Sequence, residues 1–425
     1  MTNITNNRPL FSIEKGWEVV QREVNTLHIV VIGKITGFLD PEVLRRSLLL
    51  VQRRHPRLNS HIVGPLDNLM FKTEGTEKIP LEIVLNPEPE YWLTIVSNEL
   101  NGKFESRKVL IKAILLKPSE ESTTNYLITK VHHSVADGIC AVHLHSEILN
   151  FYQKIVSNSQ ISQVIQLAPP PCMEEIISDY TIKNNAELSK SNQPIDTIPI
   201  EKYVPHQERT CGFIQKQLNP SLTQQLIQRC KQEKLTVQGA ISSAMMLALA
   251  KNLEPKDRDF YFSCFFPVEM RRKVNYPVGD EQMGILISAL TCFYTVNQKM
   301  PFWELAKQAT EQIKERIKTP EIYNSVFSFC QALEDYLDHP EKTTHSILIS
   351  NIGKVKIPSE YGDLKLEEIS FAPAITIFGN IFDVNVSTFQ EKMFFNFVYS
   401  KPLVSDAFME KLIEESIENI VVSFH

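Results

Sequence analysis

A break in the sequence pattern at residues 157–210 constrains the fold more than any other feature of the chain. Two polar stretches, Ser157–Gln163 and Asn184–Gln193, flank the stiff run Pro169-Pro170-Pro171, a composition typical of a connection between domains. On both sides of this break, runs rich in β-branched residues alternate with helical patterns. The chain has 425 residues, and single domains usually hold about 100–200. More than one domain is therefore expected.

The alternation predicts an α+β protein with two domains of similar size. The predicted parts are an N-terminal domain, an interdomain crossover and a C-terminal domain (residues 1–160, 161–210 and 211–425). Strands are expected at Leu27–Ile35, Val109–Lys117, Tyr126–His132, Phe260–Phe266, His345–Ser350, Ile381–Phe389 and Met393–Tyr399. Helices are expected from Pro41 to His55, from Gly138 to Val156, through Leu222–Cys230, from Thr236 to Ala248, over Trp303–Ile317 and over Asp406–Val421.

Composition excludes several classes of function. The chain holds only 14 glycines, about half the usual share, and it contains neither G-x-G-x-x-G nor G-x-S-x-G. A dinucleotide fingerprint and a serine-hydrolase elbow are therefore absent. The net charge of −6, without a long basic block, gives no support for a nucleic-acid partner.

The seven cysteines favour a reducing compartment. They are scattered, odd in number and without a CxxC pair, so a disulfide framework or a structural zinc site is not expected. The first residues lack the basic-then-apolar layout of a signal peptide. The longest apolar stretches fall far short of the 18 or more residues of a membrane span. These features predict a cytoplasmic protein without a membrane span.

One motif carries the clearest chemistry. It reads His132-His133-Ser134-Val135-Ala136-Asp137-Gly138 and lies where a β-rich run ends and a helix begins, a position at which functional side chains are often mounted on a rigid scaffold. Imidazole is a natural general base near neutral pH. An aspartate four residues after His133 can brace the turn, and Gly138 permits close approach of the following helix.

This motif resembles the HHxxxDG motif of the acyltransferase and condensation-domain superfamily, which has the chloramphenicol-acetyltransferase-like fold. Three further segments resemble those of the superfamily and occur in its order: Arg53–Leu58 with its His-Pro step, Phe266–Arg271, and Ile349–Gly353. The DFGWG segment of plant alcohol acyltransferases is missing, and no carrier-protein segment follows the C-terminal helix. The closest resemblance is therefore to free-standing polyketide-associated acyltransferases.

The resemblance implies two similar domains arranged as a pseudo-dimer, with an active-site channel between them. It implies that His133 is the general base, while His132, Asp137, Gly138 and Arg271 support the site. Asp137 would pair with Arg271. Ser350 and Asn351 are candidates for oxyanion or substrate contacts.

Other histidines and basic residues have simpler interpretations. His143 and His145 could suggest metal ligands, but positions two apart on a helix face different directions. We therefore expect no metal. The triplet Arg271-Arg272-Lys273 could receive a coenzyme A phosphate or an acidic carrier protein, although beyond Arg271 a solvated basic turn is the more common outcome.

The function implied is transfer of an acyl group from a thioester to an alcohol hydroxyl, without a covalent acyl-enzyme. The donor is acyl-coenzyme A or an acyl-phosphopantetheine on an acyl carrier protein, and no permanently bound cofactor is expected. Secondary metabolism, such as lipid or polyketide biosynthesis, is the expected setting. Two alternatives stay open: a condensation enzyme that forms an amide from carrier-bound partners and an amine acceptor, and a non-catalytic relative that binds a thioester or a carrier.

Overall fold

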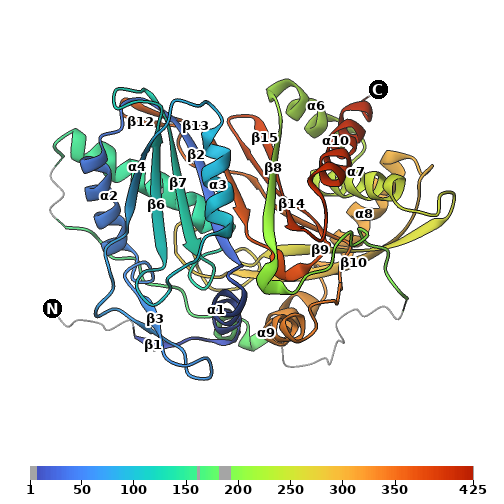
Figure 1. The fold of residues 1–425 in the computed structure, drawn as a ribbon, viewed down its shortest axis with the longest axis horizontal. Coiled ribbons are helices and arrows are strands. Elements are labelled where there is room, and N and C mark those ends of the chain that lie inside the picture. The colour runs from blue at the N-terminus through green and yellow to red at the C-terminus, as the bar shows by residue number, and fades with distance from the viewer. Residues whose placement is uncertain (1–6, 160–162, 181–192, 425) are drawn as a thin grey trace.

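Two six-stranded sheets lie side by side in the computed structural model, which describes residues 7–159, 163–180 and 193–424 (Figure 1). Helices and strands alternate in both halves, and each sheet carries helices on its outer face. The α+β class and the two-subdomain arrangement are as predicted.

The first sheet is built largely from the N-terminal half. Its strands are β2 (His28–Thr36), β5 (Leu81–Leu85), β6 (Ile111–Lys117), β7 (Thr124–His132), β12 (Glu360–Tyr361) and β13 (Leu364–Pro373), in the spatial order β12–β13–β2–β7–β6–β5. Neighbours are antiparallel except β5 and β6. Because β12 and β13 come from the last quarter of the chain, the sheet is completed by residues far away in sequence.

Helices α2 (Pro41–Arg54) and α4 (Gly138–Val156) cover the outer face of this sheet (Figure 1). Asp40 caps α2 through Oδ1, which accepts from the backbone N–H groups of Glu42 and Val43, and Pro41 supplies a preset first turn. The apolar sides of the two helices bury a core with the sheet. Helix α3 (Tyr91–Asn101) lies on the opposite face, between the two sheets.

The second sheet belongs entirely to the C-terminal half. Its strands are β8 (Thr210–Leu218), β9 (Asp259–Glu269), β10 (Ile287–Asn297), β11 (Ile347–Lys354), β14 (Phe382–Phe389) and β15 (Lys392–Lys401), in the order β10–β9–β11–β14–β15–β8. The helices on its outer face are α6 (Pro220–Gln232), α7 (Val237–Asn252), α8 (Phe302–Arg316) and α10 (Asp406–Val422). The alanine-rich α7 is buried on nearly all sides. This is expected because the helix has no polar face to expose to solvent.

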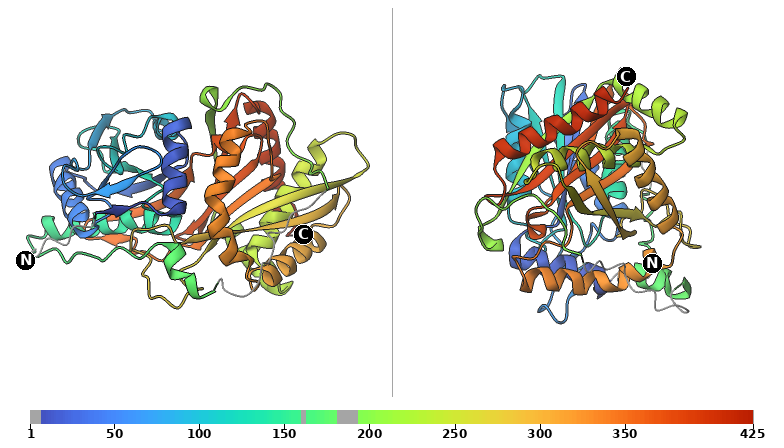
Figure 2. Two further views of the ribbon diagram at one scale, coloured as in Figure 1. Left: turned by 90° about the horizontal axis from the view of Figure 1, so that it is seen from below. Right: turned by 90° about the vertical axis from the view of Figure 1, so that its right-hand side faces the viewer.

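Two further helices lie below the sheets. These are α1 (Ser12–Val24) from the start of the chain and α9 (Glu321–Asp338) from the second half, and both views of Figure 2 show them side by side. Their facing apolar side chains form a small separate core. A three-stranded sheet, β1 (Arg8–Pro9), β4 (Met70–Lys72) and β3 (His61–Val63), lies beside α1 (Figure 1).

The domain limits predicted at residues 160 and 210 remain a prediction. Residues 161–162 and 181–192 of the expected crossover lie outside the described residues. Within the described part, the short helix α5 (Met173–Ile176) anchors the connection, because Met173 and Ile177 are buried in the core of the second half. The sheet topology also shows that residues 360–373, which follow the expected crossover in sequence, belong to the first sheet.

Candidate active site

The HHxxxDG motif lies in the turn between the end of β7 and the start of α4. Asp137 is the N-cap of α4, and its Oδ1 accepts from the backbone N–H groups of Ile139 and Cys140, at 3.1 Å each. At Gly138, an added Cβ would lie 3.1 Å from the ring of Phe371 on β13. A side chain there would require the Phe371 ring to move by a few tenths of an ångström, so glycine suits this close approach.

The second carboxylate oxygen of Asp137 connects α4 to the other half of the molecule. Oδ2 accepts from Nη1 of Arg271 at 2.7 Å and from the backbone N–H of Leu286 at 3.0 Å. Both charged side chains are 1% exposed. Burial opposes ionisation, but the charge and hydrogen bond of Arg271 outweigh it and lower the pKa of Asp137 below its ordinary value. The ion pair implied by the resemblance is therefore present.

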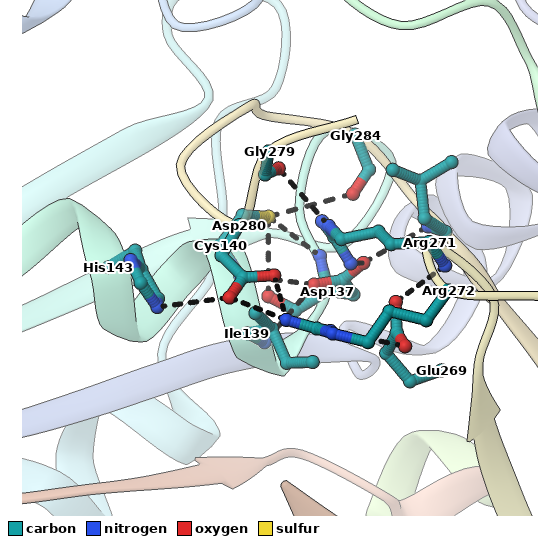
Figure 3. A network of polar contacts seen from close by, with 11 residues as sticks. Asp137, Ile139, Cys140, His143, Glu269, Arg271, Arg272, Gly279, Asp280 and Gly284 are labelled. Carbon is teal, nitrogen blue, oxygen red and sulfur yellow. Dashed lines mark hydrogen bonds and ion pairs between the residues drawn. The ribbon is translucent and has the colours of Figure 1, made fainter. Parts of the chain in front are cut away.

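The segment between β9 and β10 completes this connection (Figure 3). Arg271 also donates from Nε to the backbone oxygen of Gly279, at 3.4 Å. The next residue, Arg272, lies on the solvent side and donates from Nη2 to both carboxylate oxygens of Asp280, at 2.8 Å each. Asp280 is 3.8 Å from Nε2 of His143 on α4. Two adjacent arginines thus have different surroundings, one buried and one exposed.

His133 faces a cavity of about 280 Å³ that reaches across the junction of the two halves. Its Nδ1 is buried, which leaves Nε2 as the nitrogen available to a substrate. Burial lowers the pKa of His133 to about 4, although the nearby charge of Asp137 partly opposes the shift. The imidazole is therefore neutral at pH 7, the form that accepts a proton.

Most side chains that line this cavity are apolar. They come from both sheets and from α1 and α9. The apolar members are Ile13, Trp17, Leu27, Ile29, Ile139, Phe265, Pro267, Ile287, Ala289, Val326, Phe329, Leu348, Ile352, Phe371, Pro373, Ile375 and Phe378. A mostly apolar cavity with a few convergent polar groups is typical of a small-molecule site.

Ser350 and Asn351 line the same cavity as His133, although they are more than 200 residues away in sequence. Oδ1 of Asn351 accepts from the backbone N–H of Gly353 at 2.8 Å, so the amide nitrogen of Asn351 is the end left to donate. Gly353 has a φ of +69°, which favours glycine at this turn. The structure therefore brings the predicted oxyanion candidates to the cavity, and their role stays a prediction.

Helix α1 adds two residues that the sequence analysis did not select. The indole of Trp17 is stacked on the imidazole of His133, with ring centres 4.0 Å apart and planes 7° apart. The next residue, Glu18, places Oε2 2.9 Å from Nε2 of His132, and both side chains are fully buried. Trp17 recurs with Ile13, Val20 and Val24 at helical spacing, and this pattern was the signal available in the sequence.

His132 has no free nitrogen for chemistry. Its Nδ1 accepts from the backbone N–H of Ser134 at 3.1 Å, so the proton of a neutral ring is on Nε2, which points to Glu18. Burial opposes ionisation of Glu18, but His132, Ser106 and Arg22 outweigh it and lower the pKa of Glu18. This geometry supports the structural role predicted for His132.

The other histidines of α4 face apart, as expected. Nε2 of His145 is 2.9 Å from Oγ1 of Thr129 in the first sheet, and burial lowers the pKa of His145 to about 3. His143 lies near Asp280 on the other side of the helix. Within the described ranges, no group of three or more His, Cys, Asp or Glu side chains is arranged to hold a metal ion.

Comparison with known proteins identifies one family model and several solved structures that are similar to this chain. Residues 207–393 match the family model of the phthiocerol/phthiodiolone dimycocerosyl transferase C-terminus. Polyketide synthase associated protein 5 from Mycobacterium tuberculosis superposes with a TM-score of 0.72 at 14% identity, over 98% of this chain and 97% of the other. TRI3 trichothecene 15-O-acetyltransferase from Fusarium sporotrichioides gives a TM-score of 0.76 at 14% identity, over 99% and 95%.

The first condensation domain of the CDA synthetase also superposes, with a TM-score of 0.68 at 12% identity over 100% and 97% of the two chains. The chain has the chloramphenicol-acetyltransferase-like fold that these structures share. This two-subdomain fold was predicted from the resemblance of the HHxxxDG motif and its three companion segments. A search of curated protein sequences found no match. No helix among the described residues is long and apolar enough to span a bilayer.

Proposed function

We propose that this chloramphenicol-acetyltransferase-like protein transfers an acyl group from a thioester to an alcohol, with His133 as the general base. The observation that carries the proposal is the placement of a neutral, accessible imidazole in an apolar cavity between the two halves. Trp17, the ion pair of Asp137 with Arg271, and the cap of α4 hold that imidazole in place. The fold of acyltransferases and condensation domains supports the same chemistry.

The reaction needs no nucleophile from the protein, because a thioester is already activated. Nε2 of His133 takes the hydroxyl proton of the acceptor as its oxygen bonds to the thioester carbonyl carbon. The carbonyl electron pair moves onto oxygen, and Ser350 and the amide nitrogen of Asn351 are the candidate donors for this oxyanion. Collapse then breaks the carbon–sulfur bond, and the leaving thiolate takes the proton back from His133. The products are an ester and a free thiol.

The donor is proposed to be acyl-coenzyme A or an acyl-phosphopantetheine carried by a protein. A second cavity, of about 260 Å³, shares Ile139, Arg272 and Ile352 with the first and is lined by Lys354 and Lys356. A phosphorylated donor suits this basic entrance, while the acyl chain suits the apolar cavity. The seven cysteines form no disulfide, which supports the cytoplasm as the proposed compartment.

The test is release of free thiol from acetyl-, octanoyl- and palmitoyl-coenzyme A in the presence of short and long alcohols, with mass spectrometry of the product. We expect ester formation by the wild-type chain. His133→Ala is expected to lower turnover about 10²–10⁴-fold, the usual contribution of a general base, while the thermal unfolding midpoint stays within a few degrees. Near-normal turnover in this variant would refute the mechanism.

The same assay distinguishes the rival functions. Turnover with amine acceptors and carrier-bound donors, but not with coenzyme A thioesters, would identify an amide-forming condensation enzyme. Saturable binding of a thioester without thiol release from any donor and acceptor would identify a non-catalytic relative. Asn351→Ala and Ser350→Ala test the oxyanion assignment, which predicts a lower kcat with little change in KM.

A further inference from the structure

Helix α1 contacts both histidines of the motif, although more than 100 residues separate them in sequence. Figures 1 and 2 show α1 and α9 as a pair beneath the junction of the two sheets. Ile13, Trp17 and Val20 of α1 pack with Leu333 and Tyr336 of α9 in a core separate from those of the sheets. The helix thus lies between the two halves: it packs on α9 of the second half and hydrogen-bonds to the first half, including the motif turn through Ser134.

Trp17 covers one face of the proposed base. A ring distance of 4.0 Å and an angle of 7° place the indole flat on the imidazole, and Trp17 is only 4% exposed. On its other side, Trp17 meets Phe329 of α9, with ring centres 5.0 Å apart. The indole is therefore wedged between the catalytic ring and the second half of the molecule, and water cannot reach that face of His133.

The surroundings of His133 contain few groups that could fix its ring by hydrogen bonds. The titratable groups near it are Asp137, His132 and His28, and Asp137 is already occupied by Arg271, Leu286 and the cap of α4. Nδ1 of His133 has no hydrogen bond of ideal geometry, and the backbone of His133 itself and of Ala136 are the polar groups that contact the imidazole. The second torsion of a histidine side chain is intrinsically broad. The stacked indole adds a contact over the whole face of the imidazole, which the backbone groups at its edge do not supply.

We propose that Trp17 is a positioning residue that holds the imidazole of His133 in the plane required for proton transfer and keeps one of its faces dry. The proposal rests on His133 being the base. Loss of the indole lets the ring turn about its second torsion and admits water. A misaligned base loses rate, since displacements of about 1 Å at a reacting group can lower turnover about 10²-fold. Hydration of the ring also favours its charged form.

The test compares Trp17→Ala and Trp17→Phe with the matched control Phe329→Ala. Phe329 lines the same cavity and touches Trp17, but it does not stack on His133. For Trp17→Ala we expect kcat to fall about 10–100-fold with a smaller change in KM, and the acidic limb of kcat/KM to move to higher pH. Trp17→Phe should recover most of the rate, because a ring still covers the imidazole. Phe329→Ala should alter KM and leave the acidic limb in place.

Titration of His133 by NMR tests the stack without any substrate. In Trp17→Ala the ring-current shift of the His133 Cε1 proton should disappear, and the imidazole pKa should rise by about one unit or more. If Trp17→Ala and Phe329→Ala change KM equally and neither moves the titration of His133, Trp17 is only a wall of the cavity and the proposal fails. If no thiol is released by the wild type but the titration responds as stated, the acyltransferase function fails and the positioning contact stands.

Discussion

At the scale of single residues, the two adjacent histidines of the motif differ in what their nitrogens can do. His132 is fully buried, with Nδ1 bonded to the Ser134 backbone and Nε2 facing Glu18. His133 keeps one nitrogen toward the cavity and has an aromatic ring against one face. His132 is the last residue of β7 and His133 is the first residue of the turn that follows, so the two side chains have different surroundings and only His133 lines the cavity.

The pKa of His133 predicts an unusual pH profile. Burial lowers this pKa from the ordinary 6.5 to about 4, so the base stays neutral as the pH falls from 7 to about 5.5. The value of kcat/KM should therefore change little over this range, whereas a base with an ordinary imidazole pKa would lose most of its rate. The measurement is kcat/KM at constant ionic strength, with circular dichroism at each pH. An acidic limb of kcat/KM centred near pH 6.5 would contradict the lowered pKa of His133.

His133, Asp137 and Arg271 could be found from the sequence because they lie in short segments with a fixed residue pattern. Trp17 and Glu18 could not be assigned a role in this way. Their function comes from contact with residues 116 and 114 positions further along the chain, and helical spacing shows only that a face is buried, not what it is buried against. The site is thus predictable where its residues are adjacent in sequence, and not where the fold brings distant elements together.

At the scale of elements, α4 is the best predicted helix, with the limits Gly138 and Val156 in both the sequence analysis and the structure. Its start has a strong local signal, an aspartate cap followed by glycine. Strand β13 lacks such a signal for its location: its residues alternate as a strand should, but nothing in residues 364–373 indicates pairing with β2, more than 300 residues earlier. Local signals therefore define elements, while the choice of sheet is made by packing.

The start of α4 also allows a stability prediction. Asp137→Asn keeps the oxygen that caps the helix but removes the charge that balances Arg271, so a buried cation is left without its partner. We expect destabilisation of about 3–5 kcal/mol, measured by urea unfolding. Removing the second charge as well, in Asp137→Asn with Arg271→Met, should recover part of this loss. A double variant as unstable as the sum of the two single variants would show that the two charges are not coupled.

At the scale of the whole molecule, side chains of both halves line one cavity, and we propose the adjoining second cavity as its entrance. From the sequence, Arg271-Arg272-Lys273 could receive a coenzyme A phosphate or an acidic carrier protein, with a solvated basic turn beyond Arg271 as the more common outcome. In the structure, Arg271 forms an ion pair with Asp137, and Arg272 forms one with Asp280. Lys354 and Lys356 line the same entrance from β11 and the residues after it, and neither forms an ion pair with another described residue.

These two lysines give a test of how the donor enters. Lys354→Glu with Lys356→Glu should raise the KM for an acyl-coenzyme A by about 5–30-fold, because charge reversal near an exposed phosphate changes the interaction by about 1–2 kcal/mol. The effect should shrink in high salt, since exposed charges are screened, and kcat should stay near the wild-type value. A double reversal on the outer helices α6 and α10, Lys231→Glu with Lys411→Glu, makes the same change in net charge away from the cavity and is the control. Equal KM values in both variants would place the donor phosphates elsewhere.

The pairing of residues 360–373 with the first sheet has a consequence for how the chain folds during translation. The HHxxxDG turn is synthesised early, but β2 pairs on one side with β13, which emerges only after most of the second half. Until then one edge of β2 is unpaired, and an exposed edge is a template for the wrong strand. The nascent chain must therefore keep this edge protected through most of translation, and a fragment ending before residue 360 leaves it open permanently.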